Sequence, residues 1–341
     1  MKSSIFRTHP LAAAILFFLV RTILPLSSAA GFQLEPGASP LARAQSTSVD
    51  SRPHDRSPGP ADFLALAVPL QDESWRKQPP APRSSLPLHL PRVHQTTLPN
   101  GLTLLLIEDH RTPVVTFEIA VPVGEVNDPP HQTGLAEATA DLLTEGAGAL
   151  SSQDLARDVE AMGGRIASSS NPDYSEISAS VLAGNASKMI EILGDVLLHP
   201  TFPEQEVALY KSTRLEKLTV ERQDPAFVVA EEFNRVIYGA HPYSASAPTP
   251  ESVSGMTRSR ILDFYNTGFG PDGSYIVAVG DFDQSGMESS LLAIFAGWTR
   301  RPSPAAIFPA PPTRSEKTIY LVDRPGSDQA DVRIGNLAIK R

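Results

Sequence analysis

Between residues 92 and 300 the apolar positions of the chain follow two periods, one typical of strands and one typical of helices. Residues 94–98 and 102–108 flank an Asn100-Gly101 pair, which predicts a tight hairpin. Strands and helices come in runs without strict alternation, so the predicted fold class is α+β, an antiparallel sheet packed against several helices. The pattern predicts further strands at 116–121, 165–170, 174–182 and 274–279, and helices at 134–146, 151–163, 187–198, 203–222, 225–238, 258–266 and 283–295.

The helix predicted from Gly134 to Gly146 has an unusual polar face. Leucines and alanines at helical spacing give it an apolar stripe, typical of a buried helix. Glu137 and Asp141 lie four residues apart, so both carboxylates share one face. From this pattern alone, the simplest interpretation is a flank exposed to solvent.

Composition excludes several classes of function. A hydrophobic content of 41% with 20% charged residues is that of a globular protein. The net charge of −9 argues against nucleic acid or an anionic membrane as a partner. The chain has no cysteine, which excludes disulfides, cysteine-ligated metals and thiol catalysis. No two histidines lie three or four residues apart, so none can chelate a metal ion from one helical turn.

The N-terminus has the layout of a secretory signal peptide. Lys2 and Arg7 precede an apolar run from Leu11 to Val20, and small residues follow. Cleavage after Ala30, or alternatively after Ala44, predicts a periplasmic or secreted protein without a stable membrane anchor. An uncleaved anchor is the other alternative. The domains predicted from the whole chain are a signal peptide (1–30), a proline-rich linker (31–91), the α+β domain (92–300), a second linker (301–313) and the start of a truncated second domain (314–341), with strands at 318–322 and 332–339.

Several short motifs in a fixed order carry a family resemblance. They are Leu98-Pro99-Asn100-Gly101-Leu102, Thr133-Gly134-Leu135-Ala136, Asp224-Pro225, Tyr238-Gly239-Ala240-His241-Pro242-Tyr243 and Val279-Gly280-Asp281. Together they resemble the insulinase/pitrilysin family of zinc metallopeptidases, which includes the mitochondrial processing peptidases, over residues 92–300.

This resemblance implies a site that has lost its zinc ligands. In active members two histidines of a His-x-x-Glu-His motif bind zinc, and the glutamate activates a water molecule as general base. Here the corresponding positions hold Glu137, Ala140 and Asp141. The distant third ligand, a glutamate, corresponds to Lys217, or to Glu216 if the register slips by one. The resemblance therefore implies no catalytic residue and no bound metal in this chain, and zinc only in a partner subunit.

Lys217 suggests what replaces the metal. Our hypothesis is that its ammonium lies against Glu137 and Asp141, where zinc would lie in an active member, because an unpaired carboxylate in a half-buried place is costly. The alternative is that all three side chains point to solvent.

Peptide binding can persist without hydrolysis. In the family, the strand that corresponds to Arg165–Ser170 lies at a sheet edge and pairs with an extended peptide. This strand, with Ile166, Ala167, Ser168 and Ser169, is small and polar enough to accept another strand. An ordinary strand covered by the rest of the protein is the alternative.

The function expected from these observations is that of a non-peptidase subunit. It would pair with an active zinc metallopeptidase sister and help to bind an extended peptide substrate. Two alternatives stay open: a stand-alone peptide-binding or scaffold protein, and a metallopeptidase with an unconventional metal site.

Overall fold

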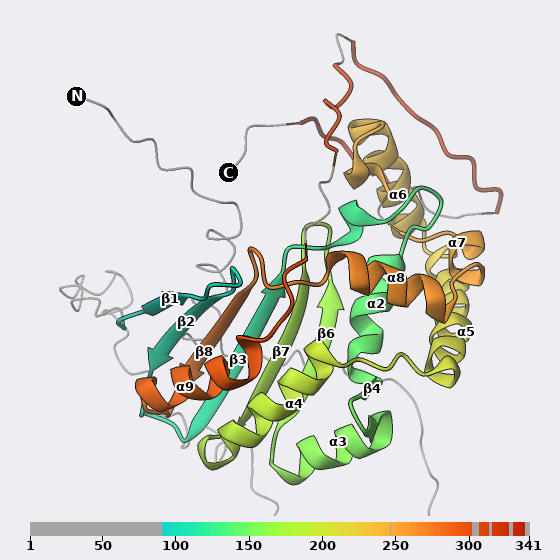
Figure 1. Ribbon diagram of the computed structural model, residues 1–341. Helices are drawn as coiled ribbons and strands as arrows, with labels where there is room; N and C mark the ends of the chain where they lie inside the picture. The colour runs from blue at the N-terminus through green and yellow to red at the C-terminus, as the bar shows by residue number, and fades with distance from the viewer. Residues whose placement is uncertain (1–90, 246, 302–306, 314–315, 327–329, 338–341) are drawn as a thin grey trace, which may run out of the picture. The chain divides into compact units, whose positions relative to one another are not determined.

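A mixed sheet of six strands organises the molecule, in the order β1-β2-β8-β3-β7-β6 (Figure 1). The computed structural model describes residues 91–245, 247–301, 307–313, 316–326 and 330–337. The predicted signal peptide and all but the last residue of the first linker lie outside these residues. The strands are β1 (His94–Thr97), β2 (Thr103–Glu108), β3 (Val114–Val121), β6 (Arg165–Ser170), β7 (Ser175–Leu182) and β8 (Tyr275–Gly280), with a small separate pair, β4 (Gly146–Ala147) and β5 (Leu150–Ser151).

The helices follow the predicted ranges closely, and the α+β class is confirmed. One short helix, α7, was not predicted. The helical segments are η3 (Glu125–Asn127), α2 (Leu135–Asp141), η4 (Leu142–Thr144), α3 (Ser152–Ala161), η5 (Ala183–Asn185), α4 (Ala186–Leu198), α5 (Glu204–Glu221), α6 (Pro225–Tyr238), η6 (Pro242–Ser244), α7 (Pro250–Ser254), α8 (Arg258–Gly268) and α9 (Gln284–Phe295). Among the described residues, no helix has the length and apolarity needed to cross a bilayer.

The predicted hairpin forms where Asn100 and Gly101 connect β1 and β2. Gly101 has a φ of 95°, and a side chain there would lie 2.7 Å from a carboxylate oxygen of Asp272, so glycine is required. The Asn100 side-chain amide donates a 2.9 Å hydrogen bond to the carbonyl of Phe295. The turn is thereby tied to the end of α9.

One pairing differs from the predicted antiparallel sheet, because β2 and β8 run parallel. The other strand pairs are antiparallel. More than 160 residues separate the two parallel strands, so no local turn sets their relative direction. Their apolar patterns would suit either direction equally well.

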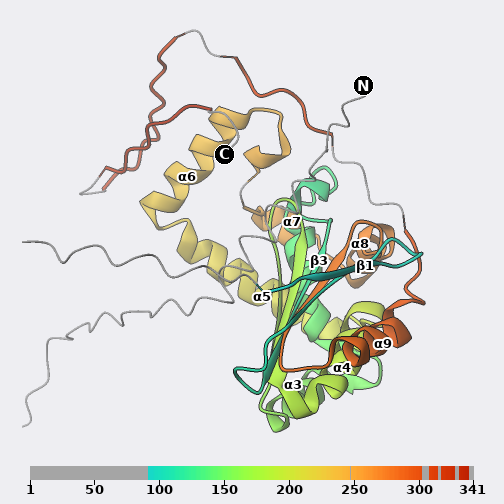
Figure 2. The same cartoon turned by 90° about the vertical axis from the view of Figure 1, so that its left-hand side faces the viewer.

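One face of the sheet carries the main hydrophobic core. Alternate residues of β3, such as Phe117 and Ile119, are fully buried there. Leu193 of α4 and Leu291 of α9 belong to the same core. Figure 2 shows both helices on this side of the sheet. The core therefore fixes the orientation of the strands, and with it the position of the edge strand β6.

Residues 318–322 and 332–337 have the sequence pattern of strands but do not pair in a sheet in the described structure. Their apolar side chains are exposed: Ile319 by 87%, Leu321 by 92% and Ile334 by 94%. The prediction that they begin a second domain stays a prediction.

Candidate functional site

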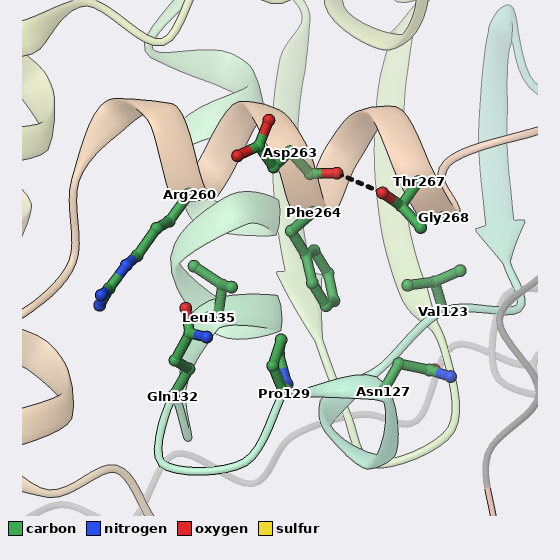
Figure 3. A pocket seen from close by; sticks show the side chains of 10 residues that line it. All are labelled: Val123, Asn127, Pro129, Gln132, Leu135, Arg260, Asp263, Phe264, Thr267 and Gly268. Atoms are coloured by element: carbon green, nitrogen blue, oxygen red, sulfur yellow. Dashed lines mark hydrogen bonds between the residues drawn. The ribbon is translucent and has the colours of Figure 1, made fainter.

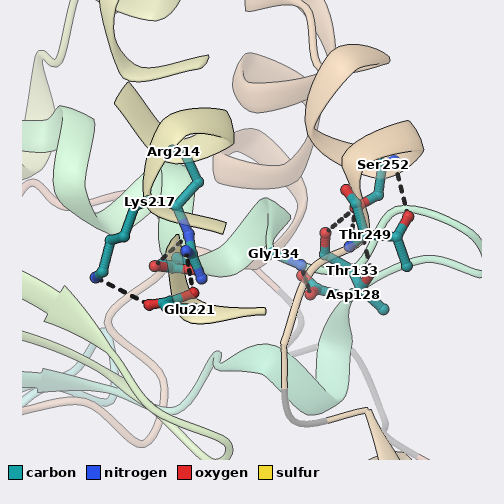
Figure 4. Close-up of polar contacts among 9 residues, drawn as sticks. Asp128, Thr133, Gly134, Arg214, Lys217, Glu221, Thr249 and Ser252 are labelled. Atoms are coloured by element: carbon teal, nitrogen blue, oxygen red, sulfur yellow. Dashed lines mark hydrogen bonds and ion pairs between the residues drawn. The ribbon is translucent and has the colours of Figure 1, made fainter. Parts of the chain in front are cut away.

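The site is built on α2, whose first turn is held by a buried carboxylate. Asp128 accepts the backbone N–H groups of Gly134 at 2.6 Å and Ala136 at 2.8 Å (Figure 4). Burial raises the pKa of Asp128 to about 7, although these two hydrogen bonds act to lower it. We take Asp128 to be ionised, because its oxygens accept two N–H groups at a helix N-terminus. Gly134 has a φ of 88°, which explains the glycine at this position.

A second contact that holds the start of α2 comes from α7. The Ser252 hydroxyl donates a 2.8 Å hydrogen bond to the carbonyl of Thr133, directly before α2. The Ser252 N–H donates to the Thr249 hydroxyl, which caps α7 (Figure 4). Thr249, Pro250 and Ser252 form a capping pattern that could have predicted this helix. Asp128 and Ser252 both bind backbone groups. They therefore hold the helix in place independently of the side chains on its exposed face.

The cation that pairs with Glu137 is Arg214 of α5. Its Nε lies 3.1 Å from a Glu137 carboxylate oxygen, and its Nη1 lies 2.9 Å from Glu221. The Arg214 side chain is only 9% exposed. Burial acts to lower its pKa, but the bonds to Glu221 and Glu137 outweigh burial and raise it. The guanidinium therefore stays charged and joins α5 to α2.

At Glu137 the ion-pair partner is Arg214 and not Lys217. The charge of Lys217 acts to lower the pKa of Asp141, and the hypothesis that its ammonium lies against Glu137 and Asp141 stays a prediction. Within 4 Å, among the described residues, the Lys217 ammonium pairs only with Glu221, at 3.8 Å, and its side chain is 61% exposed. The buried positions of α5 are Val207, Arg214 and Leu218, which lie on one face of the helix. Lys217 lies at the edge of that face, 100° around the helix from Leu218. Figure 4 shows its ammonium beside Glu221.

Glu216, the alternative for the third ligand, is also exposed. Sequence reasoning missed Arg214 because it started from the family's ligand position. The signal that could have found it is the spacing of Arg214 with Val207 and Leu218, which places it on the buried stripe of α5.

Asp141 and Ala140 occupy the other key positions of α2. Burial and the nearby Glu137 raise the pKa of Asp141 to about 6, while Lys217 and Arg214 act to lower it. Ala140 is fully buried, and its carbonyl accepts a 2.7 Å hydrogen bond from the Ser168 hydroxyl on β6. Ala140, the position that the resemblance assigns to the base, thus carries only a buried methyl group.

The side chains around Glu137 are acidic and partly shielded from solvent. Burial, followed by the charge of Glu137, raises the pKa of Glu125 to about 7. Burial also raises the pKa of Tyr210, whose hydroxyl has no hydrogen-bond partner within the described structure. These groups and Asp141 share one electrostatic neighbourhood.

The residues at the family's zinc positions do not fit zinc. Zinc sites use neutral imidazoles, thiolates or carboxylates as donors, and they exclude a fixed positive charge. Here a guanidinium already pairs with Glu137, and Ala140 offers no donor side chain. Within the described ranges, no three His, Cys, Asp or Glu side chains converge on a point where a metal ion could bind.

The edge strand β6 lies directly beside α2, and in the described sheet it pairs only with β7. The Asn171 N–H donates to the carbonyl of Tyr174, so residues 171 and 174 form a hydrogen-bonded pair. Such pairs alternate along an antiparallel ladder. The backbone amides of Ile166 and Ser168 therefore point outward from the sheet edge, whereas those of Ala167 and Ser169 point to β7.

The side chains of β6 divide between two faces. Ile166 and Ser168 are half-buried and face the helices, while Ala167 and Ser169 are exposed on the opposite face. On that opposite face, burial and the neighbouring Glu176 raise the pKa of Glu118 on β3. The predicted peptide-binding residues thus form a continuous edge, and peptide binding itself stays a prediction.

A cavity of about 270 Å³ lies between α8 and the loop that leads to α2 (Figure 3). Its floor is apolar, with Val123, Leu135 and Phe264 almost fully buried. Arg260 and Asp263 stand at its rim, and the Arg260 guanidinium already donates to the carbonyl of Gly255.

The comparisons with known proteins agree with this fold. A family model described as Insulinase (Peptidase family M16) matches residues 103–251, and one described as Peptidase M16 inactive domain matches residues 255–338. An uncharacterized zinc protease of Streptomyces coelicolor is 24% identical over 254 residues, which cover 73% of this chain and 55% of the relative. One of Bacillus subtilis is 22% identical over 197 residues, covering 57% and 47%. The chain spans about half the length of the curated relatives it matches.

Solved structures share the architecture. A peptidase M16 inactive domain from Pseudomonas fluorescens matches with a TM-score of 0.61 and 22% identity, covering 65% of this chain and 54% of that one. The periplasmic protease PqqL from Escherichia coli matches with a TM-score of 0.58 and 16% identity, covering 66% and 26%. At these identities the likeness concerns the fold alone. The two family models, matched in sequence order, identify the chain as a member of the insulinase (M16) peptidase family.

Proposed function

We propose that this protein is a non-catalytic M16 subunit that binds extended peptide beside an active zinc peptidase of the same family. The observation that carries the proposal is the Arg214–Glu137 ion pair next to Ala140. A buried guanidinium occupies the neighbourhood of the first ligand position, and the base position is a buried methyl group. The helix keeps its place while the groups needed for zinc hydrolysis are replaced.

Peptide binding by strand addition is supported by the position of β6. Its outward amides at Ile166 and Ser168 offer backbone hydrogen bonds to an extended chain. The hydroxyl of Ser168 holds the strand against α2. A bound peptide would therefore lie along the same helix that carries zinc in active family members.

Export is the second part of the proposal. Lys2, Arg7 and the apolar run of residues 11–20 favour a signal peptide, and the protein would then work in the periplasm or outside the cell. One solved relative by fold is named a periplasmic protease. The partner would be an M16 protein that carries His-x-x-Glu-His.

Zinc analysis and a cleavage assay test the loss of catalysis. The purified chain is expected to hold less than stoichiometric zinc and to leave a quenched fluorescent peptide intact. Stoichiometric zinc together with cleavage would establish the unconventional metallopeptidase instead. Co-expression with an M16 protein of the same organism that carries His-x-x-Glu-His tests the partner. Separate elution of the two would favour a stand-alone peptide-binding protein.

A pair of variants tests the β6 edge. Both Ser168→Pro and Ser168→Ala lose the hydroxyl bond to Ala140, but only the proline removes an outward N–H. Binding of fluorescein-labelled β-casein, an unfolded chain, measured by fluorescence anisotropy, is expected to weaken about tenfold more in the proline variant. Equal binding by the two variants would contradict strand addition at this edge.

A further inference from the structure

The cavity beside α8 combines an apolar floor with two charged groups of opposite sign at its rim (Figure 3). Its volume is about 270 Å³, and the buried side chains of Val123, Leu135 and Phe264 form the floor. Arg260 and Asp263 both line it from α8. Sites for drug-sized ligands have volumes of about 300–1,000 Å³, so this cavity suits a smaller molecule.

The two rim charges do not neutralise one another. Arg260 and Asp263 lie three residues apart on α8, a spacing at which helical ion pairs can form. Among the residues that the structure describes, however, neither side chain has an ion-pair partner within 4 Å. Figure 3 shows the two side chains leaving α8 in different directions. Two uncompensated charges of opposite sign therefore remain at one cavity.

Arg260 keeps donors that a ligand can use. Its Nη1 donates a 2.8 Å hydrogen bond to the carbonyl of Gly255, which holds one end of the guanidinium. A guanidinium has five N–H donors in a planar fork, and within the described ranges this side chain makes no other hydrogen bond. The remaining donors can hold a carboxylate at two points.

Asp263 offers the opposite chemistry. Its main-chain carbonyl accepts a 2.7 Å hydrogen bond from the Thr267 hydroxyl, but its carboxylate accepts none from the described part of the chain. An ionised carboxylate is an acceptor only, so its complement in a ligand is a cationic donor such as an ammonium group.

We infer that this cavity binds a dipeptide with apolar side chains and free termini. The terminal carboxylate pairs with Arg260, the terminal ammonium pairs with Asp263, and an apolar side chain packs against Phe264. A ligand with a single charge leaves one rim charge without a partner. A single amino acid fits less well, because its two charged groups share one carbon atom whereas the rim charges point in different directions.

The ligand would also contact the start of α2. Leu135 in the floor is the first residue of this helix, and its N–H donates a 3.2 Å hydrogen bond to the carbonyl of Gln132, another lining residue. Strand β6 contributes no residue to the cavity, so the inference does not depend on the proposed peptide-binding edge. Peptide hydrolysis is the class of reaction that supplies such a ligand.

Isothermal titration calorimetry of the full chain tests the inference. Leucyl-leucine is expected to bind saturably with a dissociation constant of about 0.1–1 mM. Glycylglycine has the same terminal charges without the apolar side chains, and it is expected to bind at least about tenfold more weakly. Absence of saturable binding of leucyl-leucine up to about 10 mM overturns the inference.

Two variants and two blocked ligands assign the ends of the dipeptide. Arg260→Gln is expected to weaken leucyl-leucine about tenfold but to leave leucyl-leucinamide, which has no carboxylate, unchanged. Asp263→Asn is expected to weaken leucyl-leucine about tenfold but to leave N-acetyl-leucyl-leucine, which has no ammonium, unchanged. Both side chains are exposed, so neither substitution opens the core.

The control is Lys188→Gln on α4, which removes a positive charge at an exposed position outside the cavity and is expected to bind leucyl-leucine like the wild type. Wild-type binding by both rim variants overturns the inference. Equal losses for leucyl-leucine and the matching blocked ligand overturn it as well, because the substitution then acts through something other than the terminal charge. None of these outcomes affects the β6 proposal, whose test uses Ser168 variants and a long unfolded chain.

Discussion

The backbone at the start of α2 and the side chains on the face of α2 toward α5 are held in different ways. The backbone is held by Asp128 and Ser252 with three hydrogen bonds, and glycine occupies the position of positive φ. On the face toward α5, Glu137 of the first turn is paired with a buried arginine. A helix is positioned through its backbone and its buried face, so its exposed face can change without moving it.

Loss of the hydrogen bonds that Asp128 accepts at the start of α2 is expected to have the largest effect on stability. Asp128→Ala leaves the N–H groups of Gly134 and Ala136 without their acceptor, so the free energy of unfolding should fall by about 2–4 kcal/mol in urea titrations. Asp128→Asn keeps one acceptor oxygen and should lose about half as much. A loss below about 0.5 kcal/mol for Asp128→Ala would show that the carboxylate does not hold the helix.

The ion pair between α2 and α5 should have the next largest effect. Arg214→Met leaves Glu137 and Glu221 without their shared cation, and the expected loss is about 1–3 kcal/mol because both carboxylates are still about a quarter exposed. Lys217→Ala, the matched control on the exposed side of α5, should change stability by less than about 0.5 kcal/mol. If the lysine variant lost as much as the arginine variant, Lys217 and not Arg214 would be the structural cation.

The acidic neighbourhood of Glu137 predicts a pH dependence. The folded pKa of Glu125 is about 7, above the ordinary value of 4.5. Between these values the folded state holds the proton more tightly than the unfolded state, so this stabilisation is complete below pH 4.5 and is lost as the pH rises through 7. Glu125→Gln should remove about 1 kcal/mol of the fall in stability between pH 5 and pH 8.5, allowing for solvent screening. Parallel pH profiles of the two proteins would contradict the raised pKa.

The contact between α2 and β6 should have the smallest effect. Ser168→Ala removes the hydroxyl that donates to the Ala140 carbonyl, and about 0.5–1 kcal/mol of stability should be lost. Ser169→Ala on the exposed face of the same strand is the control and should be nearly neutral. Equal losses for both serines would mean that strand propensity, and not the bond to α2, is what Ser168 contributes.

Local patterns determined much of the fold. Asn100-Gly101 specified its hairpin because few residues adopt positive φ. Asp224-Pro225 specified the start of α6, since proline fits the first helical turn and the aspartate caps it. In both cases the determining contacts lie within a few residues of one another.

The candidate site shows the limit of such reasoning. The sequence located Glu137, Ala140 and Asp141 on one helix, as the structure confirms. It could not assign the cation, because the choice between Arg214 and Lys217 depends on how α5 is rotated against α2. A difference of three residues turns a side chain by 60° around the helix, which decides between a buried ion pair and an exposed one.

The sequence by itself therefore determined the elements and the α+β class, because these depend on local periodicity and on residue identity. Only the tertiary structure decided that β2 and β8 run parallel, that α7 holds the start of α2, and that Arg214 neutralises Glu137. Each of these joins residues about 75 to 175 positions apart. Such contacts are selected by the packing of the whole core, and no local pattern encodes them.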